Sequence, residues 1–110
     1  MSKSANPGEQ VTLRAAIHKA EKAAHVADIN REAAINAAVL AAAKSVAAEE
    51  ALGKADLKKS DYNSIAKAYN DAEANLTSAV EAENAAWDAA ARADAELAAA
   101  RAAAKAAFAI

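Results

Sequence analysis

Apolar residues recur at a regular step along two long stretches of the chain. The step is eleven residues, and it joins Leu13, Ala24, Ile35 and Val46 in the first stretch and Ile65, Leu76, Trp87, Ala98 and Ala109 in the second. An eleven-residue step corresponds to about 3.67 residues per turn, close to the value of a straight α-helix. The pattern therefore predicts two long, nearly straight helices and not the seven-residue repeat of a leucine zipper.

Local signals place the start and the end of the first predicted helix. Asn6 can cap a helix, Pro7 suits the first helical position, and Glu9 can complete a capping box. We therefore expect an N-terminal arm over residues 1–6, followed by a helix over residues 7–52. Gly53 is expected to end this helix as a left-handed C′ residue.

The second helix is predicted over residues 61–109, because no glycine or proline interrupts that stretch. Ser60 is the candidate cap for this helix. The connector is then residues 53–60, with a turn at Asp56–Lys59. A short connector between two long helices implies an antiparallel pair, so residues 7–110 are expected to form one all-α helical hairpin domain.

The first helix carries large apolar residues on more than one face. Leu13, Ile35 and Val46 share one side, whereas Ile29 and Leu40 are displaced well around the helix. A helix that is apolar nearly all round needs several neighbours, and a hairpin supplies one. We therefore expect the chain to complete a bundle by association, as a homo-oligomer or within a larger assembly. The candidate interface residues are Leu13, Ile35, Val46, Ile65, Leu76, Trp87, Leu97, Phe108 and Ile110.

Trp87 and the C-terminus add detail to this expectation. Trp87 is the only tryptophan, and the favoured interpretation is a core residue facing small alanines. The alternative is an anchor between subunits. Phe108 and Ile110 give the chain an apolar end, which we expect to dock onto the N-terminal arm or into a partner.

The amino-acid composition favours a helical chain over a disordered one. Alanine accounts for 40 of the 110 residues, and the net charge is −2. Alanine is the best helix former, and a low net charge does not fit a disordered chain. With two glycines and one proline, a turn-rich β fold is excluded. Because the chain has no cysteine, disulfides and thiolate metal sites are excluded as well.

Acidic residues concentrate in one part of the second helix. The five acids between positions 71 and 88, with no base among them, are Asp71, Glu73, Glu81, Glu83 and Asp88. A solvated face is the favoured interpretation. The alternative is a docking surface for a basic partner, which would make the chain a small inhibitor or adaptor.

Catalytic and cofactor chemistry has no candidate in the sequence. His18 and His25 are seven residues apart, which separates them by about 10 Å along a helix, too far to share one metal ion. No serine has a catalytic motif around it, and no glycine-rich phosphate loop is present. We expect a protein that is not an enzyme, with no cofactor and no metal.

Targeting signals and nucleic-acid signals are also missing. The N-terminus has no apolar secretory segment, and the longest uncharged run, Ala33–Ala43, is too short to span a bilayer. The near-neutral charge offers no basic footprint for nucleic acid. We expect a location in the cytoplasm or inside a particle, with protein partners.

These observations favour a structural or interaction protein that acts through helix–helix assembly, for example as an accessory component of a phage virion. Ice binding is a further alternative, because alanine-rich helices with an eleven-residue step resemble the type I fish antifreeze proteins. Those proteins repeat threonine every eleven residues. Here the corresponding positions are Thr12, Ala23, Ala34 and Ser45, so the resemblance covers composition and period but not the threonine motif.

Overall fold

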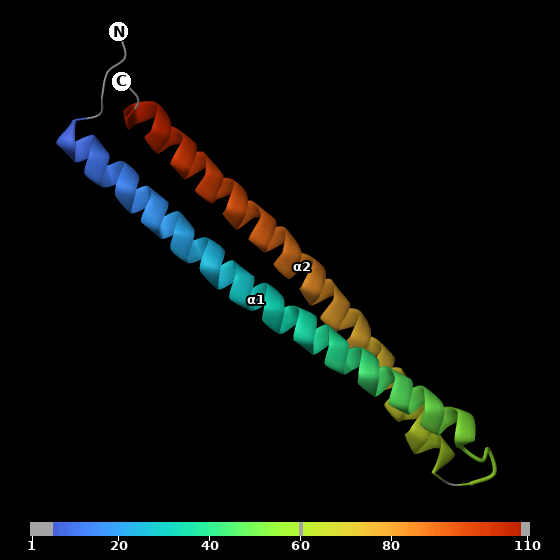
Figure 1. Cartoon of the computed structure of the whole chain (residues 1–110). Helices are drawn as coiled ribbons and strands as arrows, with labels where there is room; N and C mark the ends of the chain where they lie inside the picture. Colours follow the sequence, from blue (N-terminus) through green and yellow to red (C-terminus); the bar gives the residue numbers. More distant parts are fainter. Residues whose placement is uncertain (1–5, 60, 109–110) are drawn as a thin grey trace. The chain divides into compact units, whose positions relative to one another are not determined.

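The computed structural model describes residues 6–59 and 61–108. Helix α1 spans Pro7–Lys54 and helix α2 spans Tyr62–Phe108, and the two helices pack against each other as an antiparallel pair (Figure 1). The predicted all-α hairpin is therefore confirmed, with helix bounds within two residues of those expected from the sequence. Residues 1–5, which make up most of the predicted arm, lie outside the described part of the chain.

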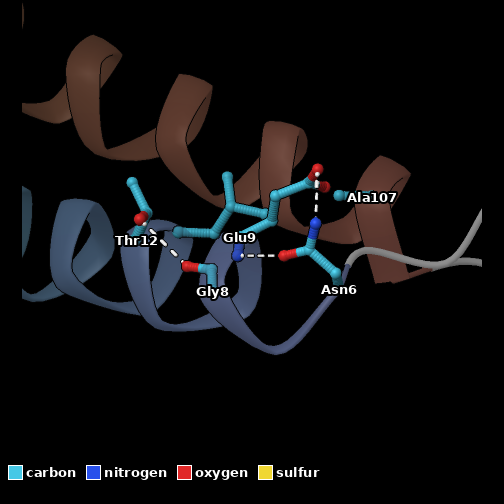
Figure 2. A pocket seen from close by; sticks show the side chains of 6 residues that line it. Asn6, Gly8, Glu9, Thr12 and Ala107 are labelled. Carbon is cyan, nitrogen blue, oxygen red and sulfur yellow. Dashed lines mark hydrogen bonds between the residues drawn. The ribbon is translucent and has the colours of Figure 1, made fainter.

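Helix α1 begins with the predicted cap at Asn6, and Glu9 bonds the Asn6 side chain and not its backbone N–H as in a capping box. The Asn6 side-chain oxygen accepts a hydrogen bond from the backbone N–H of Glu9 at 2.8 Å, and Asn6 Nδ2 donates to the Glu9 carboxylate at 3.2 Å (Figure 2). One turn further on, the Thr12 hydroxyl donates to the Gly8 carbonyl at 3.0 Å. The bond from the Glu9 N–H satisfies a backbone donor that the first turn of a helix otherwise leaves unpaired.

The end of α1 differs from the sequence-based expectation. Gly53 lies inside the helix, which continues to Lys54, and no glycine in the described residues has a positive φ. The predicted left-handed C′ conformation of Gly53 is therefore wrong. The helix ends instead with a tighter turn, in which the backbone N–H of Ala55 donates to the Leu52 carbonyl at 3.1 Å.

The connector contains the predicted turn at Asp56–Lys59. The Asp56 carboxylate accepts a hydrogen bond from the backbone N–H of Lys58 at 2.9 Å, and the Asp56 carbonyl accepts one from Lys59 at 3.0 Å. Short side chains such as aspartate favour turns by this local bonding. The predicted cap at Ser60 lies outside the described residues.

The helix pair divides into two compact units, which we describe separately. Unit 1 comprises Met1–Arg31 and Ala86–Ile110, and unit 2 comprises Glu32–Ala85. Each unit therefore contains one part of α1 and one part of α2.

In unit 1, the covered residues recur at alternating steps of three and four, which is a seven-residue repeat. We call these positions the seam of unit 1. They are Gln10, Leu13, Ile17, Ala20, Ala24, Ala27 and Arg31 of α1, and Ala86, Ala90, Ala93, Leu97, Ala100, Ala104 and Ala107 of α2. This spacing is that of a coiled coil.

Unit 2 has a seam with the same alternating steps. It consists of Ala34, Ala38, Ala41, Ser45, Ala48 and Leu52 of α1, and Tyr62, Ile65, Tyr69, Ala72, Leu76, Ala79 and Glu83 of α2. Here the larger side chains come mainly from α2, and α1 supplies mainly alanines. Small residues on one helix opposite large residues on the other allow close packing.

The seams correct the predicted period. Residues at the eleven-residue step leave the seam as the helix proceeds, so that Val46, Trp87 and Ala98 are exposed although Leu13 and Ile65 are half-buried. The physical reason is that alanine, with its small side chain, lets two helices approach closely. In each unit, the contact follows positions at which alanines of one helix lie opposite alanines or larger side chains of the other.

The buried core is correspondingly thin. Within the described residues, the buried positions are Ala24, Ala38, Ala90, Ala93, Ala104 and Ser45, and no large side chain is fully buried. Each alanine removes little apolar area from water, so each contributes a fraction of what a leucine contributes. Much of the large apolar surface is therefore left outside the seams.

Candidate interaction surface

Most of the predicted interface residues contribute to contacts within the chain. Six of them are half-buried along or beside the seams: Leu13, Ile35, Ile65, Leu76, Leu97 and Phe108. Val46 and Trp87 remain exposed. Ile110 lies outside the described residues. The six half-buried residues stabilise the hairpin itself, so a surface for a partner has to be sought mainly among other residues.

Trp87 lies at the edge of the seam of unit 1 and is not a core residue. It keeps 47 % of its surface exposed, and the guanidinium of Arg31 stacks over its ring at 4.6 Å from the centroid. Arg31 also forms an ion pair with Asp28 at 3.2 Å. The favoured interpretation of Trp87 as a core residue is therefore wrong, and its role as an anchor between subunits stays a prediction.

Phe108 packs at the other end of unit 1, near the start of α1. The Arg14 guanidinium lies 6.0 Å from the centroid of its ring. This contact holds the end of α2 against the body of α1. The predicted docking onto the N-terminal arm concerns residues outside the described part of the chain.

Unit 2 exposes large apolar side chains on α1. Val39 and Leu40 keep 63 % and 62 % of their surfaces exposed, and Val46 keeps 54 %. Val39 and Val46 are seven residues apart and share one side of the helix. The set of predicted interface residues includes Val46 but not Val39 or Leu40. Two adjacent large residues in an alanine background are the signal that could have found them.

A groove lies between the two helices of unit 2, beside the seam. Leu40 and Lys44 line it from α1, and Ala68, Asp71 and Ala72 line it from α2. The groove exists because alanines next to the seam leave space that larger side chains would fill. Its α1 side carries a lysine, and its α2 side carries an aspartate.

Unit 1 has shallow grooves of the same kind. Lys22 and Val26 of α1 line one of them together with Ala89 and Ala93 of α2. A second groove has Lys19 on the α1 side. Its α2 side is lined by Glu96 and Ala100. As in unit 2, the lysine belongs to the α1 side, and alanines line both sides.

A further depression of unit 1 lies at the capped start of α1, where Gly8, Thr12 and Leu13 line it. Ala107 of α2 completes this lining (Figure 2). The polar groups of the cap are occupied by their own hydrogen bonds. We see no arrangement of reactive groups there.

The five acidic candidates do not form one exposed group. In unit 2, Glu73 is half-buried and accepts a hydrogen bond from the buried Ser45 hydroxyl. Glu83 is a half-buried seam residue. Asp71 pairs with Lys67 at 3.0 Å. Three of the five thus have a role within the unit. Ser45 is found by its seam position and not by any motif.

The remaining acids and the histidines are exposed. Glu81 of unit 2, Asp88 of unit 1 and both histidines of unit 1, His18 and His25, face solvent. Within the described residues, no three acidic or histidine side chains come close enough together to hold a metal ion.

Neither described helix is long and apolar enough to cross a membrane.

The chain was also compared with known proteins. Comparison with protein-family models, with curated proteins and with solved structures found no match to this chain.

Proposed function

We propose that this chain is a non-enzymatic structural or interaction protein that acts by helix–helix association, as a homo-oligomer. The observation that carries the proposal is the distribution of apolar residues in unit 2. Val39, Leu40 and Val46 are exposed on α1, whereas the buried positions of the same unit are Ala38 and Ser45.

The energetic argument follows from side-chain size. Burying a leucine or valine contributes about 1.5–3 kcal/mol relative to leaving it in water. A helix that exposes several such residues outside its intramolecular contact gains this stabilisation when a further helix covers them. Association therefore supplies the burial that the thin seams lack.

We further propose that the assembly is located in the cytoplasm or inside a particle, and that it is an accessory component of a larger structure such as a phage virion. The exposed apolar side chains of α1 support this wider proposal, because contacts within a larger structure would cover them. Its test is whether the chain co-purifies with an intact particle in a fixed molar ratio.

The proposal predicts that a polar substitution at Leu40 weakens association. We expect Leu40→Gln to raise the dissociation constant by about tenfold or more, since it removes at least about 1.4 kcal/mol of apolar burial. The matched control is Leu57→Gln, because Leu57 is 75 % exposed but lies in the connector. Sedimentation velocity over a concentration series measures both variants. Equal association of the two variants would contradict the role of the α1 surface.

The two alternative functions have their own readouts. An adaptor that binds a basic partner through Asp71, Glu81 and Asp88 would bind less tightly as salt increases, whereas apolar association changes little with salt. An ice-binding protein would show thermal hysteresis. The structure disfavours ice binding, because Ala34 is half-buried and Ser45 is buried, so the eleven-residue set does not stay on an exposed face.

A further inference from the structure

The groove of unit 2 has two dissimilar rims. The α1 rim carries Leu40 and Lys44, which are one turn apart and are both exposed. The α2 rim carries the small residues Ala68 and Ala72, again one turn apart, with the carboxylate of Asp71 beside them. Ala37 and Ala41 complete the α1 side, and Asn75 completes the α2 side. The α1 rim is thus basic and carries the large apolar side chain of Leu40, and the α2 rim is acidic.

A second copy of this chain offers the complement of each rim. We propose that the groove of unit 2 packs against the same groove of a second copy, about a two-fold axis parallel to the helices. This arrangement places α1 of each copy against α2 of the other. The inference rests on the proposed function, because it names the partner and the surface of the self-association argued above.

Size and charge both match in this arrangement. Leu40 of each copy packs beside Ala72 of the other, a large side chain against a small one. Lys44 of each copy meets Asp71 of the other. Because a two-fold interface is self-complementary, each of these contacts occurs twice.

The present partner of Asp71 does not compete with this contact. Lys67 pairs with Asp71 at 3.0 Å, but both side chains are largely exposed. A surface ion pair of this kind is weak and is screened by salt. The Asp71 carboxylate can therefore turn toward a lysine of a second copy at little cost.

The mixed charge of the groove favours a second copy over a foreign helix of one charge. A uniformly acidic helix would be repelled by Asp71, and a uniformly basic one by Lys44. A second copy places its Lys44 opposite Asp71 and its Asp71 opposite Lys44, so both rims face an opposite charge.

The test uses two opposite charge reversals in the full chain. Lys44→Glu places two acids at each contact, and Asp71→Lys places two bases there. We expect each variant alone to associate about tenfold or more weakly than the wild type, since like charges then face each other twice. We expect an equimolar mixture of the two variants to recover association, as a heterodimer, because both contacts again join opposite charges.

The controls change charge by the same amount on exposed residues outside the groove of unit 2. Arg92→Glu and Glu81→Lys serve this purpose, because both residues are exposed and neither lines that groove. Far-UV circular dichroism verifies that each variant keeps its helix content. Analytical ultracentrifugation, with one variant labelled, then separates homodimers from heterodimers.

The outcomes separate this inference from the function on which it rests. Weak association of each reversal with recovery in the mixture supports the groove contact. Wild-type association in both reversals would overturn the groove contact but leave self-association intact. Weak association without recovery in the mixture would show that Lys44 and Asp71 do not meet between copies. A wild type that stays monomeric would overturn the contact and the proposed function together.

Discussion

At the scale of the residue, alanine and arginine have the clearest structural roles. Buried alanines such as Ala90 and Ala104 let the helices of unit 1 approach closely, which a larger side chain would prevent. Arg31, a seam residue of the same unit, uses its guanidinium twice, toward the Trp87 ring and toward Asp28. An arginine suits this position because its planar cation can stack on an aromatic ring while pairing with a carboxylate.

The side chains of Arg31 and Trp87 are predicted to contribute jointly to the free energy of unfolding. We expect a double-mutant cycle of Arg31→Ala and Trp87→Leu to give a coupling of about 0.5–1 kcal/mol in the free energy of unfolding, the usual size of an exposed cation–π contact. Urea unfolding followed by circular dichroism measures it. The control is the pair Arg14→Ala and Trp87→Leu, for which additive effects are expected. Additive effects in the Arg31 cycle would contradict the contact.

At the scale of the element, the start of α1 was predictable and the seams were not. The cap at Asn6 is a local signal, so the start of α1 follows directly from the sequence. The seams follow rows of alanine, and in a chain so rich in alanine these rows have no contrast with their surroundings. The large residues dominate the pattern, although Val39, Leu40 and Val46 lie outside the contact.

The candidate interaction surface was also predictable only in part. The excess of apolar residues around the first helix predicted a need for partners, because it depends on composition and helical geometry alone. The groove with Lys44 and Asp71 could not be predicted, because it depends on which face of each helix turns toward the seam. When the predicted spacing of the contact residues is wrong, residues are assigned to the wrong face of the helix.

The structure of the end of α1 predicts that Gly53→Ala stabilises the chain. Gly53 has helical backbone, and a Cβ there meets nothing within 4 Å. Alanine should therefore raise the free energy of unfolding by about 0.5 kcal/mol, since glycine costs more conformational entropy in a helix. Thermal unfolding measures the change, and Ala51→Gly should have the opposite sign. A loss of about 1 kcal/mol on Gly53→Ala would indicate a left-handed residue instead.

The seam of unit 1 predicts a sharp difference between two neighbouring alanines. Ala90 is buried and Ala91 is exposed. We expect Ala90→Leu to lower the free energy of unfolding by about 1–3 kcal/mol, because the added side chain forces the helices apart. Ala91→Leu should change it by less than about 0.5 kcal/mol. Chemical unfolding of the two variants side by side measures both effects, and equal effects would contradict the seven-residue seam.

At the scale of the whole molecule, the balance between buried and exposed apolar surface is the central feature. Both seams are built mainly from small residues, and both units leave large apolar side chains in solvent, including Val26 and Ile29 in unit 1 and Val39 and Leu40 in unit 2. Neighbouring copies would cover this surface and add the burial that the alanine seams do not provide. Self-association is therefore the claim from which the proposed function and the groove contact both follow.

The most direct test of self-association is the molar mass of the wild-type chain in solution. Light scattering over a concentration series, with circular dichroism on the same samples, gives the mass and the helix content together. We predict a highly helical species with at least twice the chain mass of 11.2 kDa, and a mass that decreases on dilution. A constant mass of one chain over the whole series would contradict self-association, and low helix content in that monomer would point to a foreign partner.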